Sequence, residues 1–370
     1  MLAFHSLRVV DIHPDAEDAV GISFEVPAEL RDEYRGLPGQ HIVVKTDIND
    51  EENRRTYSLV NAPGEWPLRI VARVHSAGHM SRYLAEQLNA GDHLDVLPPN
   101  GSFTPRRVQA GGTYVAFASG CGITPVLAIA RSLLAAHRDN RVLVFYGNAS
   151  TARTMCLEEL LALKDLYLQR LSLHFVMSRE PQEVELYNGR LDAGRVRQFA
   201  QALFSPAAVT EYFVCGPGNM LDEVSTTLRE LGVEAERIHG EHFTLATTVG
   251  AATESPVAGG SAGAARQSPL SEPVASDQCE VTVLMDGRRR TFTMQMNDEV
   301  VLDAAARAGL ELPFSCRAGV CSTCRTKVVK GEVEMAQNYA LEEWEVEQGY
   351  VLACQSHVKT PVLELDYDEK

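Results

Sequence analysis

Four cysteines near the end of the chain are spaced as the ligands of a metal cluster would be. Cys316, Cys321 and Cys324 lie within nine residues. Cys354 follows them after 29 further residues. The pattern is that of plant-type 2Fe–2S ferredoxins, in which small loop residues let backbone N–H groups point at the sulfur atoms. A structural zinc site is the alternative, although zinc more often takes two compact Cys-x2-Cys pairs.

A short motif in the first part of the chain, Arg55–Ser58 (RTYS), has the side chains that a flavin requires. An arginine can pair with a phosphate group, and a tyrosine ring can stack on the isoalloxazine. The hydroxyl group of the serine can bond a ring nitrogen. Taken alone, Tyr57 is equally typical of a half-buried strand, so the motif gains its weight from a second motif about 20 residues later.

This second motif, Gly78–Ser81 (GHMS), opens an amphipathic helix that we expect over residues 81–88. A glycine permits close approach of the backbone, and the free N–H groups at a helix N-terminus suit a pyrophosphate. A plain serine N-cap is the alternative. Because the two motifs occur in this order, we favour a flavin dinucleotide.

Two further motifs follow strands and are typical of a nicotinamide site. Ser119–Pro125 (SGCGITP) lies between a buried strand and a helix, and its glycines allow the phosphates of a dinucleotide to approach. Pro125 falls where a helix accepts proline. A later strand ends in Cys215–Gly218 (CGPG), and ligands in open α/β sheets bind beyond the carboxyl ends of strands. A small, soft thiol suits packing against a nicotinamide ring; an inert buried cysteine is the alternative.

The elements around these motifs predict three domains and a linker. Residues 1–107 alternate short apolar runs with turn signals, which predicts a β-rich domain. Residues 108–245 alternate continuous apolar strands with helical patterns, as an open parallel sheet does. Residues 246–277 are rich in Ala, Ser and Gly and predict a flexible tether. Residues 278–370 begin with a hairpin signal at Asp286-Gly287. We expect strands at 21–26, 41–46, 114–118, 142–146, 171–177 and 212–215, and helices at 125–137, 157–167, 193–203, 219–231 and 300–308.

Composition and charge exclude several classes of partner. The 370 residues are 45% apolar, and 34 basic and 50 acidic residues give a formal net charge of −16. Such acidity repels nucleic acid and anionic lipid, so we expect neither as a partner. Asp11 and Asp15 interrupt any N-terminal signal peptide, and glycines within the uncharged stretch 108–130 argue against a membrane span. We therefore expect a cytoplasmic protein without disulfides.

Together and in this order, the motifs resemble the ferredoxin–NADP reductase-like superfamily with a C-terminal plant-type ferredoxin domain. The resemblance covers nearly the whole chain apart from the tether. It implies an antiparallel FAD-binding β-barrel (1–107), an open parallel α/β nucleotide-binding domain (108–245) and a β-grasp ferredoxin domain (278–370). Within the superfamily, the stretches 338–342 (NYALE) and 349–355 (GYVLACQ) are most similar to the reductase components of phenylacetyl-CoA epoxidases.

The resemblance assigns flavin contacts to the first domain. Arg55 would hold the pyrophosphate, Tyr57 would stack on the isoalloxazine and Ser58 would bond near its N5 atom. Ala72 departs from the family, which often has lysine there. Some relatives with a C-terminal ferredoxin domain use FMN, but the helix start at Gly78 favours FAD. The expected flavin ligands are Arg55, Thr56, Tyr57, Ser58, Val71, Ala72, Arg73, Gly78, His79, Met80 and Ser81.

The resemblance assigns the hydride-transfer site chiefly to the second domain. Cys215 would lie near the reactive carbon of the nicotinamide, and Glu241 would help to orient the ring. Phe243 would cover the flavin until the nicotinamide displaces it, or would be an ordinary core aromatic. Ser58 completes the expected catalytic set. The expected nucleotide ligands are Gly120, Gly122, Thr124, Pro125, Ser178, Arg179, Cys215, Gly216, Pro217 and Phe243.

Departures from the family bear on the choice of nucleotide. Cys121 stands where relatives more often have serine or another small residue. Ala149 stands where relatives often carry an arginine that would contact the 2′-phosphate of NADPH. Ser178-Arg179 still resembles the phosphate-binding pair of the family, although Arg179 alone is also typical of a solvated loop. We therefore favour NADPH over NADH.

The implied function is electron transfer within one chain. A hydride would pass from NAD(P)H to FAD, and single electrons would pass to the 2Fe–2S cluster and on to an oxygenase component. The resemblance favours a phenylacetyl-CoA epoxidase and hence phenylacetate catabolism. A reductase for another oxygenase, hydroxylase or desaturase, acting on steroids or aromatic rings, is the alternative, and a redox sensor is a third. Segment 331–349 holds six Glu and no Lys or Arg, and is either a docking face or a solvated acidic segment.

Overall fold

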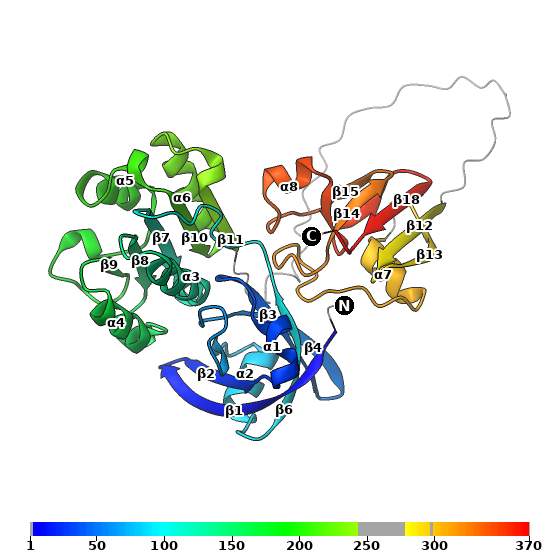
Figure 1. The fold of residues 1–370 in the computed structure, drawn as a ribbon, viewed down its shortest axis with the longest axis horizontal. Coiled ribbons are helices and arrows are strands. Elements are labelled where there is room, and N and C mark those ends of the chain that lie inside the picture. The colour runs from blue at the N-terminus through cyan, green and yellow to red at the C-terminus, as the bar shows by residue number, and fades with distance from the viewer. Residues whose placement is uncertain (1–2, 243–277, 297–298, 370) are drawn as a thin grey trace, which may run out of the picture. The chain divides into compact units, whose positions relative to one another are not determined.

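A computed structural model describes residues 3–242, 278–296 and 299–369 (Figure 1). The predicted tether at 246–277 and the site residue Phe243 lie outside these described residues. Two compact units are present: Pro313–Cys324 and Gln337–Glu343 belong with the described residues before 243, and the remaining described C-terminal residues form the other unit. Within the described ranges, no helix combines the length and apolarity needed to cross a bilayer.

The first domain is a six-stranded antiparallel sheet with the order β4-β3-β6-β1-β2-β5. Its edge strands meet through an antiparallel bridge between Leu59 and Ile70, as closure into a barrel requires. Alternate residues of β2 and β5, such as Ile22 and Ile70, are fully buried in its core. The strands are β1 (His5–Ala16), β2 (Ala19–Glu25), β3 (His41–Ile48), β4 (Glu51–Ser58), β5 (Leu68–Arg73) and β6 (His93–Asn100); the helices are η1 (Ala28–Leu30), α1 (Arg31–Tyr34) and α2 (His79–Glu86).

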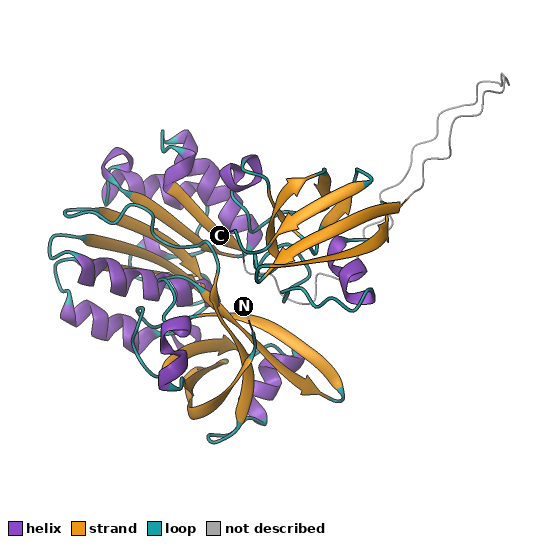
Figure 2. Cartoon of the chain, turned by 45° about the vertical axis from the view of Figure 1, so that its right-hand side comes forward, coloured by secondary structure: helices purple, strands orange, loops and turns teal. Residues whose placement is uncertain are grey.

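The second domain is a parallel five-stranded sheet with the order β11-β10-β7-β8-β9 and helices on both faces (Figures 1 and 2). Alternation along β7 explains the layers. Tyr114, Ala116 and Ala118 pack in the core that contains α3 and α4, whereas Val115 and Phe117 pack in the core that contains α5 and α6. The strands are β7 (Thr113–Ser119), β8 (Arg141–Asn148), β9 (Leu171–Met177), β10 (Glu211–Gly216) and β11 (Ile238–His242). The α-helices are α3 (Ile123–Ala136), α4 (Leu157–Leu166), α5 (Ala193–Ala202) and α6 (Gly218–Glu230); η2 (Gly120–Gly122), η3 (Thr151–Arg153), η4 (Glu185–Tyr187), η5 (Pro206–Ala208) and η6 (Ala235–Arg237) are short 3₁₀ turns.

The strands and helices expected in this domain are all present, with ends that differ by one or two residues. One expectation is wrong in detail. The continuous apolar runs of this domain, 171–177 among them, predict strands buried on both faces, but the middle residues of β9 are only half-buried. The reason is that β9 forms an edge of the sheet and pairs along its length with β8 alone.

The C-terminal module contains a mixed five-stranded sheet with the order β13-β12-β18-β14-β16. The expected hairpin is confirmed: Asp286 (φ 55°) and Gly287 (φ 68°) have positive φ values, as a type I′ turn requires.

In the segment 331–349, the side chain of Glu345 forms an ion pair inside the module. Glu345 is buried and pairs with Arg325, so it does not belong to an exposed acidic face. The elements are β12 (Gln278–Met285), β13 (Arg288–Gln295), α7 (Val301–Arg307), β14 (Arg325–Lys330), β15 (Val333–Met335), α8 (Glu343–Glu347), β16 (Tyr350–Leu352), β17 (Ser356–Val358) and β18 (Val362–Asp366).

Candidate functional site

The carboxyl ends of β10 and β11 bring Cys215 and Glu241 together. The two residues are register partners in the parallel pair, and Cys215 Sγ donates to Glu241 Oε2 at 3.7 Å. Gly122, in η2, packs directly against this end of β10. A Cβ atom at Gly122 would lie 2.1 Å from the carbonyl oxygen of Cys215. Only glycine therefore allows the two loops of the expected nicotinamide site to approach this closely.

The thiols at this site are held in their neutral form. Burial is the main cause that raises the pKa of Cys215 well above its usual value, and the neighbouring Glu241 carboxylate acts in the same direction. Burial also raises the pKa of Cys121, which lies in η2 and is only partly exposed. Neutral thiols present small, polarisable surfaces rather than nucleophiles, which suits packing against an apolar ring.

Strand β4 carries the motif Arg55–Ser58 and places its members differently. Ser58 is buried, Tyr57 is half-buried and Arg55 is exposed, with its guanidinium donating to the carbonyl oxygen of Arg54 at 2.7 Å. Burial raises the pKa of the Tyr57 phenol, so this group is neutral. Ser58 is the register partner of His41 on β3, and His41 Nδ1 lies 3.6 Å from Glu241 Oε1. His41 therefore connects the strand pair of the flavin motif to the carboxylate of the second domain.

The motif Gly78–Ser81 begins α2, two residues earlier than the sequence predicts. Gly78 is the N-cap, and the Ser81 side chain lies inside the first turn. The Ser81 hydroxyl accepts a hydrogen bond from the His75 N–H at 3.1 Å and donates to the Gly78 carbonyl at 3.2 Å. The alternative of a serine N-cap at Ser81 is therefore wrong, because the Ser81 hydroxyl bonds the loop that precedes the helix.

The expected flavin contacts Val71, Ala72 and Arg73 lie on β5.

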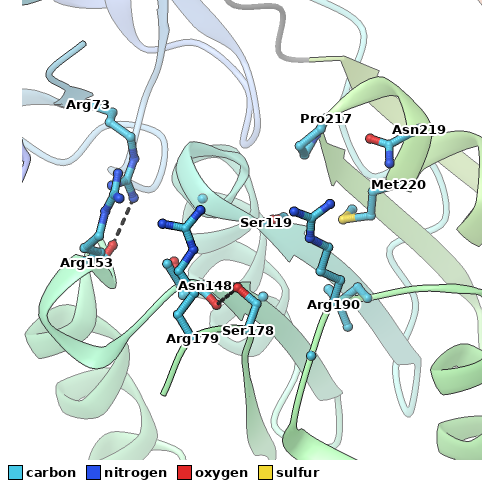
Figure 3. Close-up of a pocket in the computed structure, with 15 residues that line it drawn as sticks. Arg73, Ser119, Asn148, Arg153, Ser178, Arg179, Arg190, Pro217, Asn219 and Met220 are labelled. Carbon is cyan, nitrogen blue, oxygen red and sulfur yellow. Dashed lines mark hydrogen bonds between the residues drawn. The ribbon is translucent and has the colours of Figure 1, made fainter. Parts of the chain in front are cut away.

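A cavity of about 420 Å³ opens beside these elements in the second domain (Figure 3). Four of the lining side chains are arginines and none is acidic. Gly120, which has φ +56°, and Pro217, the N-cap of α6, lie at the strand ends as expected. The lining residues are Arg73, Ser119, Gly120, Gly147, Asn148, Ala149, Arg153, Ser178, Arg179, Gly189, Arg190, Leu191, Pro217, Asn219 and Met220.

The four arginines of this cavity fall into two pairs, one bound to a carboxylate and one exposed. Arg73 and Arg153 share the carboxylate of Asp18, and Arg73 also donates to the Arg153 carbonyl at 2.9 Å. Arg179 and Arg190 are exposed, and no hydrogen bond or ion pair joins either guanidinium to another residue in the described part of the chain. Figure 3 shows these two side chains on either side of Ser119. The second pair is therefore available to an anionic ligand.

Of the remaining expected nucleotide ligands, Ser178 lines this cavity, whereas Thr124, Pro125 and Gly216 are not among its lining residues. Thr124 and Pro125 lie in the first turn of α3, where the Thr124 hydroxyl donates to the Cys121 carbonyl at 2.9 Å. Ser178 donates to the Asn148 carbonyl at 3.3 Å and thereby joins the ends of β9 and β8. A Cβ atom at Gly216 would lie 3.0 Å from the Met220 side chain.

The loop of Cys316, Cys321 and Cys324 fits an iron–sulfur cluster. The three thiols interact, and contact with Cys316 is the largest of the causes that raise the pKa of Cys321. The Ala318 N–H donates to Cys316 Sγ at 3.3 Å. Ser315 Oγ is buried and has no hydrogen-bond partner among the described residues, as expected for a hydroxyl that awaits a cluster sulfur. Cys354 is buried directly after β16.

Comparison with known proteins covers each of these regions. An oxidoreductase FAD-binding domain matches residues 7–104, an oxidoreductase NAD-binding domain matches 117–226, and a 2Fe-2S iron-sulfur cluster binding domain matches 283–359. One subunit of the 1,2-phenylacetyl-CoA epoxidase of Escherichia coli (strain K12) is 37% identical over 100% of this chain and 99% of its own length. The chain belongs to the ferredoxin–NADP reductase-like flavoproteins with a C-terminal 2Fe–2S ferredoxin domain. It is an NAD(P)H-dependent flavin and iron–sulfur oxidoreductase whose cofactors are FAD and a 2Fe–2S cluster.

Other similar proteins share the same build as this reductase. The ferredoxin reductase component of the 3-ketosteroid-9-alpha-monooxygenase of Rhodococcus rhodochrous is 30% identical over 98% of this chain and 96% of its own length. Among solved structures, phthalate dioxygenase reductase is 21% identical, with a TM-score of 0.55 and 98% coverage of both chains. That structure supports the antiparallel, parallel and ferredoxin domains as a fold.

Sequence reasoning missed several residues that line this cavity of the reductase. Arg153, Arg190, Asn148, Asn219 and Met220 enter it from four different loops or strand ends. None belongs to the flavin or nicotinamide motifs, although Arg190 closes the stretch 187–190 (YNGR) that also resembles the family. For Asn148, Asn219 and Met220 the available signal was their position at or just after the ends of β8 and β10, where such ligands are expected.

Proposed function

We propose that the reductase supplies electrons to the oxygenase component of a phenylacetyl-CoA epoxidase and thus acts in phenylacetate catabolism. The observation that carries this proposal is the 37% identity with the Escherichia coli epoxidase subunit over essentially both full lengths. The 3-ketosteroid relative is similar over nearly the same length at 30% identity, so a steroid oxygenase is the second candidate acceptor.

In this proposal each site residue has a structural task, and FAD supplies the conversion of a hydride into single electrons. Ser58, Tyr57 and Arg55 would contact the flavin from β4. Gly122 and Gly216 leave space at the end of β10, and the neutral Cys215 thiol would border the nicotinamide ring while it donates to Glu241.

Cluster binding is assigned to the four cysteines of the C-terminal module. We propose Cys316, Cys321, Cys324 and Cys354 as its ligands, because the 2Fe-2S domain family covers all four positions. The curled loop supports this assignment: Arg317, Gly319 and Ser322 all have positive φ values, between 50° and 73°. This backbone turns N–H groups inward, as a cluster of excess negative charge requires.

We further propose that NADPH is the preferred electron donor. Arg179 and Arg190 carry two positive charges into a cavity that has no acidic lining residue. A 2′-phosphate would form charge-assisted hydrogen bonds with such guanidinium groups, whereas the ribose hydroxyl of NADH would leave them unpaired. Ala149 removes one phosphate contact that relatives often have, and Arg190 would compensate for it.

Replacement of Arg179 by alanine should weaken NADPH selectively. We expect KM for NADPH to rise about 10- to 100-fold, the worth of a charge-assisted hydrogen bond, and KM for NADH to stay nearly constant. The measurement is steady-state ferricyanide reduction with each nucleotide. Arg190→Ala should act in the same direction.

Arg138→Ala is the matched control, because Arg138 is 93% exposed in the same domain and, within the described ranges, pairs only with its neighbour Asp139. The control should leave both KM values unchanged. Equal losses with NADPH and NADH in Arg179→Ala would contradict phosphate recognition by this arginine.

Coupling to a purified oxygenase tests the proposed acceptor. With NADPH present, the reductase should support product formation by a phenylacetyl-CoA epoxidase oxygenase at a rate that saturates with oxygenase concentration. A 3-ketosteroid oxygenase assayed in parallel should accept electrons much more slowly. If only the steroid enzyme turns over, the acceptor is wrong although the electron chain stands.

A further inference from the structure

Three strands bring His41, Glu241 and Cys215 into one buried cluster of titratable groups. His41 lies on β3, Cys215 lies near the end of β10 and Glu241 lies on β11. One carboxylate oxygen, Oε1, lies 3.6 Å from His41 Nδ1, and the other, Oε2, accepts from the Cys215 thiol at 3.7 Å. Glu241 thus joins an imidazole of the flavin domain to the thiol of the nucleotide domain.

The side chains of His41 and Glu241 are both largely withdrawn from water. The side chain of His41 is 4% exposed and that of Glu241 is 14% exposed. A carboxylate withdrawn from water is unfavourable unless a positive charge or good hydrogen bonds replace the water. The thiol offers a weak hydrogen bond and no charge. The His41 imidazole is the group at contact distance that can supply such a charge.

The second ring nitrogen of His41 distinguishes this pair from an ordinary structural ion pair. His41 Nε2 is buried and has no hydrogen-bond partner among the described residues. Both amide atoms of Asn100, the register partner of His41 on β6, are also buried without partners there. Gly101 leaves room for the ring, since a Cβ atom there would lie only 3.0 Å from it. Buried polar atoms are normally satisfied, so this ring keeps one nitrogen available to a group not yet bound.

The other titratable groups that act on this cluster do not supply a proton. Burial chiefly raises the pKa of Cys215 and of Cys121, so both thiols are already protonated at neutral pH. Arg73 acts on Cys121, and its own charge is paired with Asp18. Ser58, the register partner of His41 on β4, is buried and does not titrate.

We propose that His41 is a positioning residue for Glu241 and that this pair takes up one proton when the neighbouring flavin is reduced. The inference rests on the proposed hydride transfer to FAD beside Ser58. The hydride moves two electrons and one proton from the nicotinamide to the flavin and adds one negative charge there. The further proton comes from water to His41, and it returns to water when the electrons leave for the cluster.

The number of protons taken up with two electrons tests this proposal. The readout is the pH dependence of the flavin midpoint potential in the full-length, FAD-loaded protein. Over one window of pH, the wild type should take up one proton more per two electrons than a variant whose residue 41 cannot titrate. His41→Gln keeps a hydrogen-bond donor that cannot titrate, and should lack this additional proton at every pH.

A second readout and two further variants make the outcome decisive. A pH-indicator dye should report proton uptake on photoreduction of the wild type, and one proton less per two electrons in His41→Gln within the window. His13→Gln is the matched control, because His13 pairs with Asp11 at 2.8 Å on the surface of the same sheet and should behave as wild type. Glu241→Gln should move the window to lower pH, and it replaces His41→Gln if that variant does not bind FAD.

Equal proton numbers in the wild type and His41→Gln at every pH would overturn the proposal, as would an unmoved window in Glu241→Gln. A wild type that is not reduced by NADPH would instead contradict the proposed function. The two failures are therefore distinguishable in one set of samples.

Discussion

Gly122→Ala should nearly abolish hydride transfer while leaving the fold intact. Gly122 has φ −60°, a conformation that alanine accepts, so the effect would be steric rather than conformational. The added Cβ would lie 2.1 Å from Cys215 O and 2.6 Å from Cys215 C, and both are backbone atoms that cannot rotate away. The two loops of the nicotinamide site must separate, and a misplacement of about 1 Å costs on the order of 100-fold in rate.

Anaerobic stopped-flow bleaching of the flavin by NADPH measures this effect directly. Gly194→Ala is the matched control, because a Cβ atom at this position in α5 meets only an Asp192 side-chain atom at 3.4 Å. We expect wild-type rates in the control. Wild-type rates in Gly122→Ala would show that the contact between η2 and β10 does not shape the hydride-transfer site.

Cys321→Ser should separate the two halves of the electron chain. A serine hydroxyl is a poor ligand for iron in a 2Fe–2S cluster, so the cluster should be lost. FAD should still be reduced by NADPH and should still pass electrons to ferricyanide. Transfer to a one-electron protein acceptor should fall to the level of cluster-free protein. Absorbance and electron paramagnetic resonance spectra of the reduced protein measure the cluster.

Cys279→Ser is the control for this substitution, because Cys279 is fully buried in β12 of the same module and lies outside the four-cysteine pattern. Its cluster signal should match that of the wild type. A full cluster signal in Cys321→Ser would remove Cys321 from the ligand set that we propose.

The fold of the second domain could be predicted from the sequence because its strands lie between two layers of helices. Continuous apolar runs such as 114–118 have no other stable place, and the helices between them are amphipathic. The half-buried face of β9 could not be predicted, because composition does not reveal which strand forms the edge. The four-residue helix α1 is too short for a periodic signal.

The candidate site could be predicted where its residues belong to short sequence motifs. It could not be predicted where residues far apart in the sequence come together only in the folded chain. Gly122 and Cys215 belong to short motifs that follow strands, and the structure brings them into contact. His41 lies far from Glu241 in the sequence and is an ordinary strand residue until two sheets place it beside the carboxylate. Arg153 and Arg190 are likewise joined only by the cavity that they line.

Electrons pass from NAD(P)H through FAD to the cluster within one chain. An anaerobic absorbance titration of the purified holoprotein with NADPH tests this transfer most directly. We expect bleaching of both the flavin and the cluster bands, with uptake of about three electrons per chain, two by the flavin and one by the cluster. Bleaching of the flavin alone would contradict the internal electron chain.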